Sequence, residues 1–149
     1  MQIEVQQNVD ETGELEEFTW DLFPLVDASE TTHLDESGLP KLGARIKAGM
    51  IIVGKIAKSR SYDPERQPTA LEIQGLDRRT LCSKYGGMWH DTSLYADEAQ
   101  SGLVRGASFV QRNGSTVAVI LIEKEVSAPE GAEKRAGGRK RGRERMARG

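Results

Sequence analysis

The dipeptide Asn113-Gly114 constrains the fold of this chain more than any other feature of its sequence. It separates two segments rich in apolar and β-branched residues, ASFVQR and STVAVILIEKE. Asparagine followed by glycine favours the two-residue turn whose backbone twist matches that of two antiparallel strands. The sequence therefore predicts a β-hairpin with strands over residues 107–112 and 115–124.

Short apolar runs separated by glycine predict further strands along the chain. Residues 2–6, QIEVQ, alternate polar and apolar as a half-buried strand does. Within residues 39–56, two apolar runs flank Lys47-Ala48-Gly49, where the glycine allows the positive φ angle of a tight turn. Helical patterning is confined to residues 71–87, where Gly75 interrupts it. About six to eight short strands with little helix predict a mainly β protein, a small barrel or sandwich.

Composition is typical of a polar globular domain with a modest core. The 149 residues are enough for one domain with tails, and 37% of them are hydrophobic and 30% charged. No apolar run reaches the roughly 20 residues that a membrane-spanning helix needs. The single cysteine, Cys82, fits a cytoplasmic protein without internal disulfides. The apolar segment 18–26, FTWDLFPLV, is expected to help cover the core.

Charge is distributed unevenly between the two ends of the chain. Residues 127–149 contain eight basic and three acidic residues, a net charge of +5, which leaves −7 for residues 1–126. The basic segment has almost no large apolar side chains, so we expect it to be disordered. Flexible cations bind phosphates without reading sequence. The candidates for contact with nucleic acid are Arg139, Lys140, Arg141 and Arg143, and a merely solubilising tail is the alternative.

Residues 49–56, GMIIVGKI, have the G-x-x-x-x-G-K spacing of a phosphate-binding loop, but their chemistry does not fit one. The four residues between the glycines are apolar and mostly β-branched, which favours a buried strand over a loop. Ile56 stands where a serine or threonine would hold Mg²⁺. We therefore interpret this segment as a strand bounded by glycines.

No pattern of catalytic or metal-binding residues is evident. His33 and His90 lie in polar contexts that predict loops, without cysteine or histidine at the spacing of a zinc site. Cys82, His90 and Asp91 could form a nucleophilic group only by chance proximity. We expect no catalytic residue, no cofactor and no metal ion.

Several motifs, taken in order, resemble one known family. THLDESG at residues 32–38 is followed by KAG at 47–49 and by IIVGK at 51–55. SYDPERQ, LCSKYGGMWHDTSL and SGLVRGASFV then follow in the same order as in that family. Together with a looser match at the N-terminus they cover roughly residues 1–124. This arrangement resembles a segment of the large β subunit of bacterial DNA-directed RNA polymerase, a nucleotidyltransferase complex that carries out transcription.

The resemblance implies a sandwich–barrel hybrid domain, known as the flap, over residues 1–126. A short helical tip is expected at 63–87, and the disordered tail at 127–149. In that family the flap forms a wall of the RNA exit channel, and its tip docks the promoter-recognition domain of the sigma factor. The implied partners are the other polymerase subunits, a sigma-like factor and nascent RNA or DNA, with no membrane.

The resemblance also suggests which side chains of the tip contact a transcription factor. The candidates are Leu71, Leu81, Tyr85 and Trp89. Cys82, Ser83 and Lys84 make this helix more polar than is usual in the family. The alternative is that the apolar residues of the tip simply pack it onto the body of the domain.

The motif of the family that faces the active centre, R-H-G-x-K-G, does not follow the VAVILIEKE segment of this sequence. The aspartates that bind catalytic Mg²⁺ belong to the other large subunit. We therefore expect the chain to be non-catalytic alone: a part of a split polymerase, a free-standing relative or a gene fragment.

Two other function classes remain as alternatives. Lipoyl and biotinyl carrier domains share the hybrid-barrel architecture, and residues 46–50 resemble one of their turns. Such carriers hold a modified lysine at a hairpin tip, whereas Asn113-Gly114 offers none. The other alternative is a stand-alone RNA-binding adaptor that acts through the basic tail.

Overall fold

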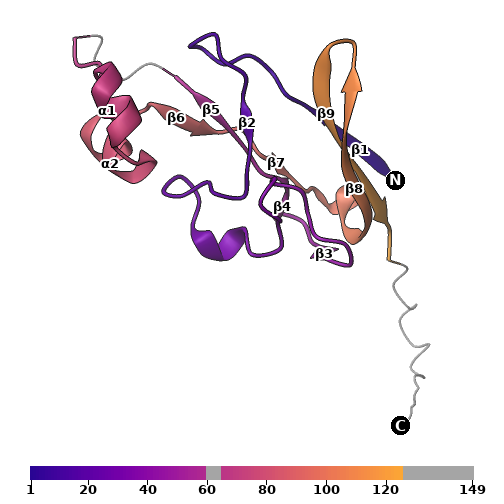
Figure 1. Ribbon diagram of the computed structural model, residues 1–149. Helices are drawn as coiled ribbons and strands as arrows, with labels where there is room; N and C mark the ends of the chain where they lie inside the picture. The colour runs from indigo at the N-terminus through magenta and orange to yellow at the C-terminus, as the bar shows by residue number, and fades with distance from the viewer. Residues whose placement is uncertain (60–64, 126–149) are drawn as a thin grey trace.

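The computed structural model describes residues 1–59 and 65–125, which are mainly β (Figure 1). The strands are β1 (Gln2–Gln6), β2 (Glu17–Phe18), β3 (Arg45–Ile46), β4 (Ile51–Val53), β5 (Lys55–Lys58), β6 (Trp89–Asp91), β7 (Leu94–Tyr95), β8 (Gly102–Arg112) and β9 (Ser115–Glu123). The helices are α1 (Ala70–Gly75) and α2 (Arg78–Lys84), with single 3₁₀ turns η1 (Ala28–Glu30) and η2 (Glu98–Gln100). No helix in the described ranges is long and apolar enough to cross a membrane.

The predicted hairpin is the centre of the largest sheet. This antiparallel sheet has the strand order β1-β9-β8-β3. Asn113 and Gly114 form the turn with φ angles of 53° and 80°, the left-handed values that a two-residue hairpin turn requires. The structure confirms the hairpin, although β8 begins at Gly102, five residues before the predicted start.

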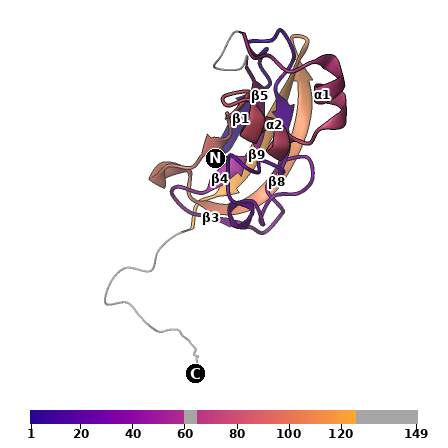
Figure 2. The same cartoon turned by 90° about the vertical axis from the view of Figure 1, so that its left-hand side faces the viewer.

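The β8 strand is bent along its length. Its register with β9 shifts between Val104 and Gly106. An extra residue in one strand of an antiparallel pair bends that strand and increases its twist. Figure 2 shows the resulting curvature of β8 and β9, which lets the sheet wrap around the core.

Two smaller sheets extend the domain away from the hairpin. One has the order β2-β5-β6, and the other pairs β4 with β7. In Figure 1, β5 and β6 run toward α1 and α2, which lie at the opposite end of the domain from β8 and β9. His90, which was expected in a loop, lies in β6 opposite Ala57.

The buried residues form three apolar clusters. The largest lies on the inner face of the main sheet and contains Ile3, Leu39, Ile46, Ile52, Val53, Ala96, Val104, Ala118, Ile120 and Ile122. A second, formed by Leu22, Val26, Leu34, Ile51 and Ile56, lies beside it, and a third lies under the helices. The segment 18–26 covers the core only in part, because Trp20, Phe23 and Leu25 are exposed.

The segment with phosphate-loop spacing is structural, as the sequence indicated. Gly49 occupies a turn with a φ angle of +90°, and β4, which follows it, is fully buried. A Cβ atom on Gly54 would lie 2.2 Å from the carbonyl oxygen of Thr19, so only glycine allows this approach of the two backbones. The two glycines therefore shape a strand and its neighbour.

The mainly β fold agrees with the expected hybrid domain, and the helical part is a pair of short helices. Gly75, which the sequence predicted to interrupt the helical segment, is the last residue of α1, and Leu76 and Asp77 separate it from α2. The four nucleic-acid candidates of the basic tail lie outside the described residues, as do the expected boundary at 126 and the start of the tip at 63.

Candidate docking site at the helical tip

Two local hydrogen-bonding patterns start the helices of the tip, which we define as residues 69–88. Thr69 caps α1: its Oγ1 accepts a hydrogen bond from the amide of Glu72 at 3.1 Å. The Glu72 carboxylate accepts one in return from the amide of Thr69 at 3.0 Å. Asp77 caps α2 by accepting a hydrogen bond from the amide of Thr80 at 2.8 Å. Both helices are short, so these caps largely define them.

Glu72 also joins the two helices to each other. Its carboxylate accepts hydrogen bonds from the ammonium group of Lys84 and, at 2.7 Å, from the hydroxyl of Tyr85. The bond from Lys84, followed by those from Thr69 and Tyr85, lowers the pKa of Glu72 to about 2. The same carboxylate raises the pKa of Lys84 and of Tyr85. The ionised Glu72 therefore holds α1 against α2.

The four predicted contact residues occupy three different environments. Leu81 and Tyr85 are 2% and 7% exposed and form the third apolar cluster with Met88. Trp89 is half-buried and packs against this cluster and against the second one. Leu71, at 81% exposure, points into solvent. Leu81 and Tyr85 thus hold the tip together, and Leu71 is the candidate whose side chain a partner can reach.

Arginine side chains fasten the tip to the body. Arg78 donates a hydrogen bond of 2.6 Å to the carbonyl oxygen of Asp21. Its guanidinium group also lies 6.0 Å from the centre of the Trp89 ring. Arg79 lies over the ring of Phe23 at 5.1 Å. These contacts connect α2 to the loop that follows β2 and give the tip a defined orientation.

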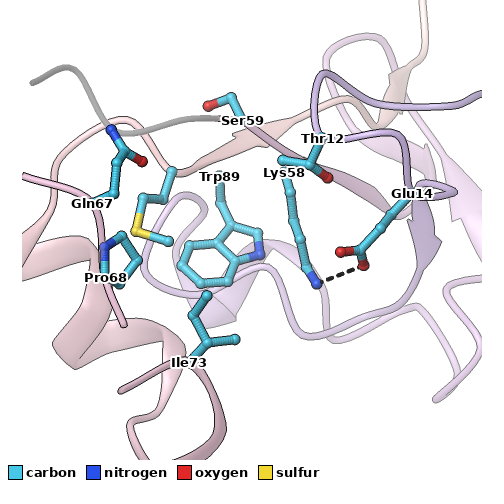
Figure 3. A pocket seen from close by; sticks show the side chains of 9 residues that line it. Thr12, Glu14, Lys58, Ser59, Gln67, Pro68, Ile73 and Trp89 are labelled. Atoms are coloured by element: carbon cyan, nitrogen blue, oxygen red, sulfur yellow. Dashed lines mark hydrogen bonds and ion pairs between the residues drawn. The ribbon is translucent and has the colours of Figure 1, made fainter. Parts of the chain in front are cut away.

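A pocket of about 230 Å³ lies between α1 and the body (Figure 3). Its lining residues come from four separate segments: Thr12, Glu14, Lys58, Ser59, Gln67, Pro68, Ile73, Met88 and Trp89. Figure 3 shows the Trp89 ring with Ile73 below it, Pro68 to its left and Lys58 to its right. Lys58 and Glu14 form an ion pair of 3.0 Å at the rim.

Sequence reasoning did not single out Ile73, although its position makes it a candidate. It is 50% exposed and lines the pocket. The six-residue helix α1 is too short for an apolar periodicity to appear, so helical spacing gives no signal. The available signal was the composition of the segment, since LEIQG places two large apolar residues between polar ones in an otherwise charged region.

Lys55, the residue at the position of a phosphate-loop lysine, is committed to a structural ion pair. Its ammonium group lies 2.7 Å from the carboxylate of Glu16, and both side chains are buried. It also donates a hydrogen bond to the carbonyl oxygen of Gln6 at 3.1 Å. Burial acts to raise the pKa of Glu16, but the bonds from Lys55 and the Asn8 amide outweigh it and hold this pKa below its usual value.

The environments of Cys82 and Asp91 do not favour a nucleophilic group with His90. Burial raises the pKa of the Cys82 thiol, which favours the unreactive protonated form. Asp91 accepts hydrogen bonds from the Ser93 amide and the Tyr95 hydroxyl. Within residues 1–59 and 65–125, no group of three potential ligands could hold a metal ion.

Comparison with known proteins gives the family of the chain. The model of the family described as RNA polymerase Rpb2, domain 6, matches residues 2–137. The chain therefore belongs to this family of RNA polymerase domains, which confirms the resemblance found in its motifs.

Two bacterial relatives show the extent of the similarity. The chain is 35% identical to the DNA-directed RNA polymerase subunit beta of Desulfosudis oleivorans over 99 residues, which are 66% of this chain and 7% of that protein. It is 34% identical to the subunit beta of Bacteroides thetaiotaomicron over 90 residues, which are 60% of this chain and 6% of that protein. The matched part of the chain thus covers less than a tenth of the length of each relative.

Proposed function

We propose that this chain acts in transcription as a flap-like, non-catalytic part of a DNA-directed RNA polymerase. In this role it packs against other polymerase subunits and walls the path of the nascent RNA. The observation that carries the proposal is the family match over residues 2–137, which includes the whole of the tip. The mainly β body with one pair of helices at its end fits such a role.

The tip is the part that docks a transcription factor, of which a sigma-like factor is the first candidate. Leu71 supports this assignment because its large apolar side chain is exposed on α1, where no packing within the described chain requires it. Ile73, on the same helix, adds half-exposed apolar surface. A partner that covers these two side chains removes their apolar surface from water, which favours binding.

Purification of a tagged full-length chain from its native host tests the proposal. We expect stoichiometric recovery of the remaining polymerase subunits together with a factor of the sigma type. Leu71→Asp should remove the factor and retain the subunits. Leu42→Asp is the matched control, because Leu42 is 72% exposed in the turn before β3, away from the tip.

Each result separates one part of the proposal from the other. Recovery of the subunits with a factor that is insensitive to Leu71→Asp contradicts docking through the tip. Recovery of a factor without subunits points to a free-standing regulator. If a folded sample recovers neither, the polymerase role is wrong for this chain.

A further inference from the structure

We propose that the pocket beneath α1 receives one aromatic side chain from the partner that docks on the tip, and that lysine or arginine lies next to this side chain in the partner. This inference rests on the proposed function of the tip. The inference adds to the proposed function a specific receiving site and the chemistry of the segment that binds there.

The lining of the pocket favours an aromatic ring. Pro68, Ile73, Met88 and Trp89 supply most of its apolar surface, with the Trp89 indole at the centre (Figure 3). An indole ring offers a flat partner for a second ring, and a methionine thioether makes favourable contacts with aromatic rings. A pocket of about 230 Å³ holds one large side chain but no long segment of chain.

The position of the pocket links it to the exposed surface of α1. Ile73 belongs to both, since it lines the pocket and is half exposed. Leu71 lies two residues before it on the same short helix. Residues two positions apart on a helix point to different sides, so Leu71 and Ile73 belong to different faces of α1. A partner segment therefore reaches the opening of the pocket along the face that carries Ile73 and can place one side chain inside it.

Charge at the rim indicates what surrounds that side chain in the partner. Residues 10–14 carry three carboxylates, on Asp10, Glu11 and Glu14, and the cation that lines the rim beside them is Lys58. Lys58 is paired with Glu14. The Asp10 carboxylate accepts a hydrogen bond from the amide of Thr12, in the same turn.

Arg78, which lies over the Trp89 ring, is balanced by Glu17 at 3.9 Å and Asp21 at 3.7 Å. The excess negative charge of residues 10–14 therefore favours lysine or arginine next to the inserted ring, on that side of the rim.

Packing fixes the position of the Trp89 ring, so the pocket is already formed in the free chain. The ring packs between the second and third apolar clusters, and Arg78 lies over it. Because these contacts fix the ring, binding costs little ordering of the pocket itself.

The test is a titration of the ¹⁵N-labelled full-length chain with N-acetyl-tryptophanamide, followed by NMR. The indole N–H signal of Trp89 should shift with half-saturation at about 1–10 mM, the range expected for a single side chain. Trp20 is the internal control, since it is exposed and does not line the pocket. No shift of the Trp89 signal, or equal shifts of both signals, overturns the inference.

Two matched variants on α1 locate the binding. Ile73→Ala should weaken binding of the probe by about 3–10-fold through lost apolar contact, whereas Leu71→Ala should leave it unchanged. If both substitutions weaken binding equally, or if neither weakens it, the probe does not bind in the pocket.

A pair of peptides tests the charge of the partner. Acetyl-Lys-Trp-Lys-amide should bind at least about 3-fold more tightly than acetyl-Glu-Trp-Glu-amide, and added salt should reduce the difference. Equal affinities overturn the assignment of a basic partner.

These measurements can contradict the pocket inference without contradicting the proposed function, and the reverse also holds. If Leu71→Asp releases the co-purified factor but the probes do not bind, docking on the tip stands and the pocket is not its receiving site. If the probes bind and no factor or subunit is ever recovered, the pocket is real and the polymerase role is wrong.

Discussion

Gly54 shows how a single residue determines the approach of two segments. The Thr19 carbonyl oxygen occupies the space that a side chain at position 54 would need. The amide of Thr19 donates a hydrogen bond to the carbonyl oxygen of Gly54 at 3.0 Å, which keeps the two backbones together. β5 follows directly and pairs with β2, so the approach sets the position of this sheet.

Gly54→Ala should destabilise the domain by about 2–3 kcal/mol, because the atom that the new methyl group meets belongs to the backbone. Urea unfolding followed by tryptophan fluorescence measures the change. Gly75→Ala is the matched control: a Cβ atom there meets nothing within 4 Å, and its effect should stay within about 0.5 kcal/mol. Equal costs for the two substitutions contradict the role of Gly54.

The buried Lys55–Glu16 pair predicts an asymmetry between single and double substitutions. Lys55→Met leaves the Glu16 carboxylate buried without its cation and should cost about 3–5 kcal/mol of unfolding free energy. In Lys55→Met with Glu16→Gln, the neutral amide oxygen can still accept the hydrogen bond that the Asn8 amide now gives to the carboxylate at 2.9 Å. The double variant should therefore be more stable than Lys55→Met alone.

Chemical unfolding of the three proteins at pH 7 provides the comparison. If the two substitutions simply add, so that the double variant is the least stable, the pair does not behave as a coupled buried unit.

At the level of elements, the sequence predicted what local chemistry determines. The Asn113-Gly114 turn fixes its own hairpin because both residues favour left-handed backbone, and α1 ends at Gly75. The Lys55–Glu16 pair joins residues 39 apart in the chain, and the pocket is assembled from four distant segments. No local pattern encodes such contacts.

The predicted contact residues illustrate the same limit. The resemblance to the polymerase family grouped Leu71, Leu81, Tyr85 and Trp89 as one surface. Whether a side chain on so short a helix faces the body or the solvent depends on where the body lies. Tertiary packing places Leu81 and Tyr85 inside and leaves Leu71 outside.

The tip as an element should lose stability in acid before the main sheet does. The pKa of Glu72 is about 2 in the folded chain and about 4.5 when unfolded. A carboxylate whose pKa is lower in the folded than in the unfolded chain stabilises the fold at pH values above its unfolded pKa. This contribution disappears as the pH falls from about 4.5 to about 2. In ¹H–¹⁵N spectra, amide signals of α1 and α2 should lose dispersion in this window while those of β8 and β9 persist.

Glu72→Gln is the control for this pH dependence. The variant should have a less stable tip at pH 7 and a weaker response between pH 4.5 and 2. The response that remains belongs to Asp77, whose pKa is also lowered, by its hydrogen bonds with Thr80 at the start of α2. An unchanged pH profile in Glu72→Gln contradicts the role of Glu72 in joining the helices.

At the scale of the whole molecule, the body of the chain and its C-terminal segment carry opposite net charge. Residues 1–126 carry a net charge of −7, whereas residues 127–149 carry +5. An acidic body repels the phosphates of RNA, so we expect affinity for nucleic acid to depend on the basic segment. A cationic segment next to an RNA path would retain the transcript without selecting its sequence.

Neutralising the basic segment should therefore weaken RNA binding and its dependence on salt. Replacement of Arg139, Lys140, Arg141 and Arg143 by glutamine removes up to four phosphate contacts. Each contact with single-stranded RNA contributes about 0.7 to the slope of log affinity against log salt concentration, so the slope should decrease by about 3. Fluorescence anisotropy with a labelled single-stranded RNA at several salt concentrations measures this slope, and deletion of residues 127–149 should decrease the slope at least as far.

The matched control replaces Arg105 and Arg112 by glutamine. These residues pair with Glu123 and Glu4 on the main sheet, so their replacement should leave the slope unchanged. Retention of RNA at low salt that is equal in the full-length and truncated chains would show that the basic segment has no role in binding RNA.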